Sequence, residues 1–189
     1  EHEVLLWAPH TDDCVDYQFG KRIDSPEDSD VIVITGSRRN VSQWEPWMDE
    51  VANLIRTCEV PLYGICFGHQ IICKALGGDV IRAEETSAFI SNVTYSDGKI
   101  TKQLFTHQDH VINSGEMEVI GSAEHCEIAV CKHPTRPIKT VQFHPEAVKS
   151  VLEYSLECGD MNEEERAAFA DGIQDLDVTT SLLISARAE

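Results

Sequence analysis

Basic residues are scarce in this chain. Only 15 lysines and arginines stand against 33 aspartates and glutamates, which gives a formal net charge of −18 over 189 residues. Because affinity for nucleic acid depends on cations that displace counterions from phosphates, this balance disfavours a nucleic-acid-binding protein. The acidic residues are dispersed, with local concentrations at 24–30 and 163–165, which fits either an ordinary solvated surface or a protein from a saline environment.

Long apolar runs are also missing. No stretch approaches the length needed to cross a bilayer, and no basic-then-apolar segment suggests secretion. The seven cysteines are odd in number and form no C-x-x-C pair, which favours a reducing compartment over a disulfide framework. We therefore expect a cytoplasmic protein that makes no contact with a membrane.

Two common catalytic motifs are absent as well. The chain contains neither the phosphate-binding loop G-x-x-x-x-G-K-[ST] nor the G-x-S-x-G motif of serine hydrolases. Any ATP-dependent step would therefore take place on another chain. With 42% hydrophobic content, the chain can bury one sizeable core, so we expect a single domain over 1–189.

A thiol between two glycines is the most informative feature that is present, in the segment G-I-C-F-G-H-Q at 64–70. Residues 62–65 resemble the end of a buried strand, and 71–76 have the apolar spacing of a helix. The backbone must turn sharply between them, and the two glycines remove the Cβ atoms that would clash in such an elbow. The helix N-terminus then stabilises a thiolate, so Cys66 is the candidate nucleophile rather than a small buried hydrophobe.

A base for this thiol stands near the other end of the chain. Residues 139–143 alternate like a strand and lead into His144-Pro145-Glu146. Residues two apart on an extended segment point the same way, so Glu146 can orient the imidazole of His144. The proline fits a strand end, where a catalytic base on a loop would lie. The motif is weak alone and gains weight from the thiol.

Together, G-I-C-F-G-H-Q at 64–70 and Q-F-H-P-E at 142–146 resemble the class I glutamine amidotransferases. The resemblance covers 28–148. T-H-Q-D-H-V at 106–111 is similar to the H-x-D-x-V segment of the branch that includes the GMP synthase amidotransferase domain, and plant γ-glutamyl peptidases form a related group.

The resemblance implies an activity and further site residues. A triad of Cys66, His144 and Glu146 would hydrolyse the side-chain amide of glutamine through a γ-glutamyl thioester and release ammonia. Gln70, one helical turn beyond the thiol, matches a residue that contacts bound glutamine. The backbone around 106–107, at Thr106 and His107, matches the segment that holds the α-amino and α-carboxylate groups.

Acyl transfer also needs two backbone N–H groups aimed at the developing oxyanion. Phe67, directly after the thiol, supplies one. In the family the second comes from a glycine-rich turn after an earlier strand, which matches Gly36 and Ser37 after the strand at 31–35. Two successive glycines are usual at this turn, so which of the two residues provides the N–H stays open. A glycine is also usual at Thr140, and we interpret this departure as a packing variation.

The order of the elements predicts the fold class. We expect strands at 3–7, 31–35 and 62–65, helices at 42–56 and 71–76, strands within 92–106 and 118–143, and a helical C-terminal extension at 158–189. This alternation predicts an α/β, single-domain, open, mostly parallel twisted sheet of flavodoxin-like type, with helices on both faces and some antiparallel strands. Family members usually have an extra strand and helix before the equivalent of Glu3. We therefore expect either that this chain is a fragment or that its N-terminus is shorter than usual.

Two groups of potential metal ligands stand in the second half of the chain: His107, Asp109 and His110, and Cys126, Cys131 and His133. The first group matches no strong metal template and is better explained by substrate binding. The thiols of the second group are too far apart for a compact zinc knuckle. We therefore expect no metal site, and no cofactor.

Three functions stay open. The first is a glutaminase module that binds glutamine and makes ammonia for a separate ATP-dependent synthetase, as in GMP synthase and purine biosynthesis. The second is a free-standing γ-glutamyl peptidase, which would use the same triad without a partner. The third is a non-catalytic binding module of the same fold, and the intact triad argues against it. The sequence does not identify the ammonia acceptor or the oligomeric state.

Overall fold

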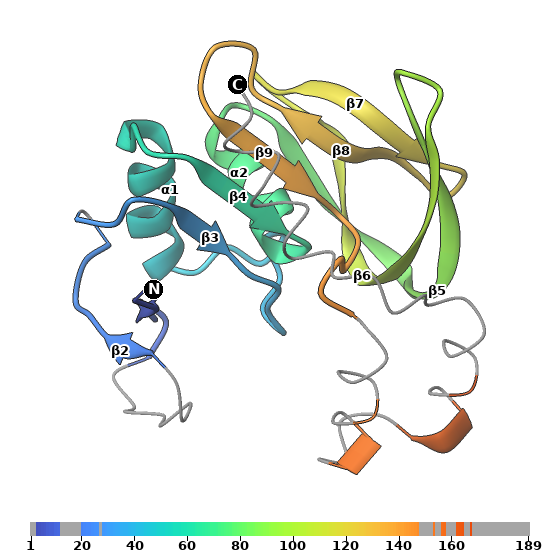
Figure 1. Cartoon of the computed structure of the whole chain (residues 1–189), viewed down its shortest axis with the longest axis horizontal. Helices are drawn as coiled ribbons and strands as arrows, with labels where there is room; N and C mark the ends of the chain where they lie inside the picture. The colour runs from blue at the N-terminus through green and yellow to red at the C-terminus, as the bar shows by residue number, and fades with distance from the viewer. Residues whose placement is uncertain are drawn as a thin grey trace.

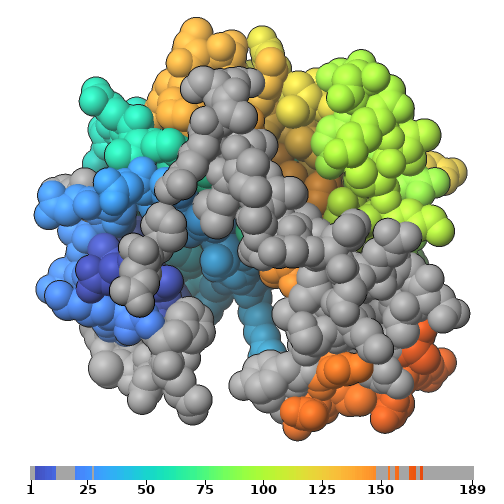
Figure 2. All heavy atoms as spheres, in the orientation of Figure 1, coloured from blue at the N-terminus to red at the C-terminus, as the bar shows by residue number. Residues whose placement is uncertain are grey.

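The computed structural model describes residues 3–11, 20–26 and 28–147, together with 153, 156, 157, 162–164 and 167. Most of the predicted helical extension at 158–189 lies outside these residues, so this extension and the single domain over 1–189 stay predictions. In the space-filling view the segments up to β3, in blue, and the β5 region, in green, lie on opposite sides of the molecule (Figure 2).

A seven-stranded mixed sheet is the framework of the described chain (Figure 1). Its strands, in spatial order, are β3 (Ile32–Ile34), β4 (Leu62–Ile65), β9 (Ile138–Val141), β8 (Cys126–Lys132), β7 (Glu118–Ala123), β5 (Asp79–Tyr95) and β6 (Ile100–Asn113). β3, β4 and β9 are parallel neighbours, whereas the pairs from β9 to β6 are antiparallel. A separate parallel pair joins β1 (Leu5–Leu6) to β2 (Lys21–Arg22). The predicted α/β fold is confirmed.

Two helices are described, α1 (Trp47–Thr57) and α2 (Phe67–Ala75), and they contact each other. The buried positions of α1 follow the 3.6-residue period of an amphipathic helix: Met48, Val51, Ala52 and Ile55. We predicted that this helix starts at 42, but Pro46 caps it, because the residue before a proline is biased away from helical conformation. Neither helix has the length and apolar character that a bilayer-spanning segment needs.

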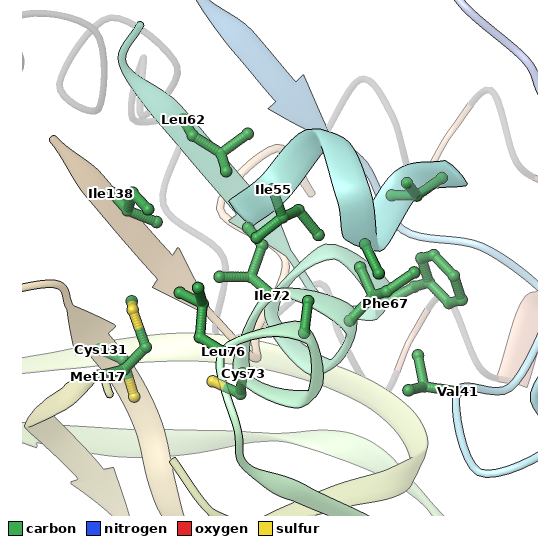
Figure 3. Close-up of a cluster of buried hydrophobic side chains, with 14 of the residues drawn as sticks. Val41, Ile55, Leu62, Phe67, Ile72, Cys73, Leu76, Met117, Cys131 and Ile138 are labelled. Carbon is green, nitrogen blue, oxygen red and sulfur yellow. The ribbon is translucent and has the colours of Figure 1, made fainter. Parts of the chain in front are cut away.

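Two apolar clusters stabilise the sheet. The first lies between the helices and the sheet and includes the fully buried Ile55, Leu62, Ile72 and Ile138 (Figure 3). The second includes Ile65, Phe105, Val141 and Phe143. Burial of each such side chain stabilises the fold by about 1.5–3 kcal/mol relative to exposure. Leu62 and Ile65 of one strand thus serve different clusters, and β4 is buried along its whole length.

Candidate active site

Cys66 lies between β4 and α2 in an unusual backbone conformation. Its φ is 52° and its ψ is −102°, and among the described residues it is the one non-glycine with positive φ. The N–H of Cys66 donates to the carbonyl of Val141 at 2.9 Å, and its carbonyl accepts from the N–H of Gln70 at 3.1 Å. Such conformations cost about 1–3 kcal/mol and cluster at active sites. β9 and α2 together hold the thiol in this position.

The glycines that flank the thiol allow α2 to begin directly against the backbone of the sheet. A Cβ on Gly64 would lie 2.6 Å from the carbonyl carbon of Gly68. A Cβ on Gly68 would lie 2.0 Å from the carbonyl oxygen of Ile34 in β3. Both distances are far below any real contact, so these positions accept no side chain. The G-x-C-x-G pattern is therefore a requirement for close packing as well as for the turn.

His144 and Glu146 follow β9 and are hydrogen-bonded to each other. Nδ1 of His144 donates to Oε1 of Glu146 at 2.7 Å, which leaves Nε2 as the free nitrogen of the ring. Burial opposes protonation of the imidazole, but the nearby sulfur of Cys66 in its thiolate form and the carboxylate of Glu146 favour it and raise the pKa of His144 to about 10. The Nε2 atom is buried and makes no hydrogen bond in the resting site. It is the atom available to exchange a proton with a thiol.

The turn after β3 meets these groups. A Cβ on Gly36 would lie 3.1 Å from Cε1 of His144 and 3.8 Å from Cβ of Cys66. Ser37, by contrast, is exposed, and its hydroxyl accepts from the N–H of Arg39 at 3.0 Å. The N–H of Phe67, at the first position of α2, has no acceptor within its helix. The structure therefore brings Gly36, the thiol and the imidazole together at the carboxyl ends of β3, β4 and β9.

Thr106 of β6 contacts the thiol, and His107 follows it in the strand. The thiol of Cys66 donates to the carbonyl of Thr106 at 3.7 Å, a long and weak contact that suits sulfur. The ring of His107 is buried, and its Nδ1 donates to the carbonyl of Asp109 at 2.9 Å. Burial lowers the pKa of His107 to about 4, so this ring is neutral at physiological pH.

Gln70 is held inside the molecule. Its side-chain amide donates to the carbonyl of Asp109 at 3.0 Å and to Oε1 of Gln142 at 3.2 Å, and both glutamines are buried. These bonds use both hydrogens of the Gln70 amide. The structure thus places Gln70 in a network that joins α2 to β6 and to the segment after β9, and its predicted contact with glutamine stays a prediction.

Asp109 has a role that the sequence did not suggest. Its carboxylate is 2% exposed and accepts from both the N–H and the hydroxyl of Ser42, at 2.8 and 2.7 Å. A guanidinium nitrogen of Arg82 lies 3.7 Å away. These contacts fix the segment between Gly36 and α1 against β6. The available signal was an acidic residue on the same face of the strand as Phe105 and Val111, since a buried charge requires partners.

The departure at Thr140 also has a structural explanation. Its hydroxyl lies 2.8 Å from Nδ1 of His69, whose Nε2 donates to the carbonyl of Ile128 at 3.0 Å. Complete burial lowers the pKa of His69 to about 3, so the ring stays neutral and satisfies both neighbours. Thr140 therefore pairs with His69 of α2, as a glycine could not.

Residues 12–156 match the profile of the family described as glutamine amidotransferase class-I. The chain belongs to this family. The glutamine-hydrolysing subunit of GMP synthase from Methanothermobacter thermautotrophicus is 37% identical over 101 residues, which cover 49% of this chain and 54% of the relative. The same subunit from Methanocaldococcus jannaschii is 37% identical over 100 residues, covering 47% and 52%. The chain spans about half the length of these curated relatives.

A solved glutamine amidotransferase from Thermotoga maritima has the same fold. It superposes with a TM-score of 0.69 at 20% identity, covering 88% of this chain and 80% of that one. The predicted class I glutamine amidotransferase family is confirmed.

Proposed function

We propose that this chain hydrolyses the side-chain amide of glutamine and supplies ammonia to an ATP-dependent synthetase on a separate chain, in the manner of GMP synthase. The observation that carries this proposal is the strained elbow at Cys66, which lies against Gly36 and the His144–Glu146 pair. The relatives with 37% identity are glutamine-hydrolysing subunits of GMP synthase, which supports a partner on another chain.

The first half of the proposed reaction is acylation of the thiol. Cys66 and His144 react as a thiolate–imidazolium pair, in which Nε2 of His144 already carries the proton, and the thiolate attacks the side-chain amide carbon of glutamine. The oxyanion that forms accepts hydrogen bonds from the N–H of Phe67 and from the turn at Gly36. His144 then donates its proton to the departing nitrogen, and ammonia leaves a γ-glutamyl thioester on Cys66.

The second half is hydrolysis of the thioester. His144 takes a proton from water, and the hydroxide attacks the thioester carbon. Glutamate leaves as the C–S bond breaks, which restores the thiolate of Cys66 beside the protonated His144. Glu146 contributes by holding Nδ1–H, so that Nε2 faces the reacting atoms in both halves.

Dependence on a partner gives the first testable prediction. We expect low glutaminase activity for the isolated chain, rising at least about tenfold, or ~1.4 kcal/mol in barrier, when its synthetase and the substrates of the synthetase are added. The physical reason lies in the turn after β3, where Ser37 stands in place of a second glycine. We expect this turn to align the second oxyanion N–H only in the complex. Ammonia release from glutamine measures the effect.

The control for this prediction is a γ-glutamyl dipeptide, assayed with the purified chain alone. A peptidase would need no partner and would accept this substrate. High turnover of the dipeptide with little hydrolysis of glutamine would replace the amidotransferase proposal with that of a γ-glutamyl peptidase.

A second prediction concerns Glu146→Gln, which removes a charge and keeps the shape. We expect kcat/KM to fall by about 100-fold, less than for loss of the nucleophile, because Glu146 orients the base and does not react. Glu146 is among the groups that raise the pKa of His144. The variant should therefore lose the imidazolium, and its activity, at a lower pH than the wild type. A pH profile of kcat/KM measures both effects, and an unchanged basic limb would contradict the assigned role.

A further inference from the structure

Three histidines and a cysteine gather at β6, the strand that carries Thr106, and we call them the His–Cys cluster: His107, His110, His125 and Cys126. The ring centroids of His107 and His110 are 4.5 Å apart, and those of His107 and His125 are 6.0 Å apart. The potential ligand atoms of His107, His110 and Cys126 all lie within 4.8 Å of one another. The first two side chains come from β6, and the other two come from the end of the β7–β8 turn and the start of β8.

Several nitrogens in this cluster lack a partner. A carbonyl only accepts hydrogen bonds, so the bond from His107 to the carbonyl of Asp109 fixes the proton on Nδ1 and leaves a lone pair on Nε2. That Nε2 is buried without a partner, and so are both ring nitrogens of His125. Buried polar atoms are nearly always hydrogen-bonded, so these orphaned nitrogens point to a ligand. Metal-bound histidines typically show this bond to a carbonyl from the other ring nitrogen.

We propose that the His–Cys cluster is a Zn²⁺ site, with His107, His110 and Cys126 as ligands and His125 beside the fourth position. Imidazole and thiolate ligands favour Zn²⁺ strongly over Mg²⁺ or Ca²⁺, which take oxygen ligands. A tetrahedral ion with such ligands needs its donor atoms about 3.3–3.8 Å apart, so side-chain movements of about 1 Å close the site. Binding releases the proton of the Cys126 thiol to solvent.

A second group in the described chain meets the same distance criterion, but its histidine has no free ring nitrogen. His69, Cys73 and Cys131 lie within 4.8 Å of one another and are all buried. Both ring nitrogens of His69 are already hydrogen-bonded, to Thr140 and to the carbonyl of Ile128. This group is therefore a satisfied part of the core, and it provides an internal comparison for the His–Cys cluster.

The site has a consequence for catalysis, which rests on the proposed function. His107 directly follows Thr106, whose carbonyl accepts from the thiol of Cys66. An ion bound to the cluster would fix this part of β6 to the start of β8 and occupy the ring of His107. We infer that Zn²⁺ lowers glutaminase activity by holding the strand that is proposed to bind glutamine.

Binding is tested on the full chain carrying Cys66→Ala, which removes the active-site thiol as a competing ligand. Titration with Zn²⁺ by calorimetry should give one bound ion, and Co²⁺ should give a thiolate charge-transfer band with the visible absorption of a tetrahedral ion. Adding Cys126→Ser should weaken Zn²⁺ binding at least about tenfold and remove that band. His110→Gln, at a half-buried position, should weaken binding equally without loss of a thiol. Cys58→Ser is the matched control and should bind as the Cys66→Ala protein does.

Several outcomes would overturn the site. They are the absence of a tetrahedral Co²⁺ spectrum, or loss of binding in Cys131→Ser with retention in Cys126→Ser. If Cys126→Ser does not fold, His110→Gln decides alone, and unchanged binding in that variant refutes the proposal.

Activity is a separate readout. Zn²⁺ should inhibit ammonia release by the wild type, and His110→Gln should relieve this inhibition. A chain that binds Co²⁺ as expected but never hydrolyses glutamine would refute the proposed function and leave the metal site intact.

Discussion

Cys66→Ala will abolish the release of ammonia from glutamine while the protein stays folded. We expect a loss of at least about 10⁴-fold in kcat, because the thioester requires the sulfur and no other residue of the site can replace it. The side chain of Cys66 is small, so its truncation leaves a minor cavity and a modest decrease in melting temperature. Ammonia release and thermal unfolding, measured on the same preparations, check both parts.

Cys58→Ala is the matched control for this substitution. Cys58 is a free cysteine at the end of α1, half-buried and outside the proposed site. The control should keep its activity. A Cys66→Ala protein that retained most of its activity would remove the thioester mechanism. A Cys66→Gly variant adds a second readout, since glycine accepts the positive φ at this position, and it should be at least as stable as Cys66→Ala.

Gly68→Ala will have the largest effect on stability. The added Cβ would lie 2.0 Å from the carbonyl oxygen of Ile34 and 2.8 Å from its carbonyl carbon, and both are backbone atoms of β3 that cannot rotate away. α2 must therefore move off the sheet, and we expect the free energy of unfolding to fall by more than about 4 kcal/mol. Urea unfolding measures this change, and poor expression of folded protein would be the same result in its extreme form.

The matched control is Gly77→Ala, after the end of α2. Its φ is 86°, but no atom lies within 4 Å of the position of the added Cβ. Only backbone strain opposes this substitution, at a cost of about 1 kcal/mol. Equal destabilisation in the two variants would mean that α2 is not held against β3 in the way described.

The central part of the site was accessible from the sequence because its signals are local. The glycines around Cys66 and the two-residue spacing of His144 and Glu146 are set by the turn and by the extended backbone, respectively. The bond between Nδ1 and Oε1 at 2.7 Å is what that spacing allows. Geometry that depends on one element alone can be predicted in this way, whereas the catalytic roles of these residues stay predictions.

Contacts between distant elements were not accessible. The bonds of Asp109 to Ser42 and of Thr140 to His69 join residues 67 and 71 positions apart, and no local pattern encodes their pairing. The same reason explains why the sequence disfavoured a metal site. His110 and Cys126 come from different hairpins, so no spacing motif reveals that the fold brings them together.

The extent of the β5–β6 hairpin was also missed. The sequence predicted strands from 92 to 106, and the turn between Tyr95 and Ile100 lies where expected, but pairing continues to Asp79 and Asn113. The part of β5 from Asp79 to Asn92 is mostly exposed and polar. The register of the β5–β6 pair also shifts between Arg82 and Ser87. A strand held by its partner rather than by burial carries little periodicity in its own residues.

The close packing of α2 against the sheet divides the site into a rigid part and an adjustable part. No side chain separates Gly64 and Gly68 from the backbone of β3, so Cys66 between them has no room to move. Its strained geometry therefore exists before any substrate binds. The imidazole of His144 and the carboxylate of Glu146 belong to the segment after β9, outside the packed contact between α2 and the sheet. Because the sulfur of Cys66 is held in place, the groups around it determine when catalysis starts or stops. We therefore expect a signal that controls catalysis to act on those groups and not on Cys66.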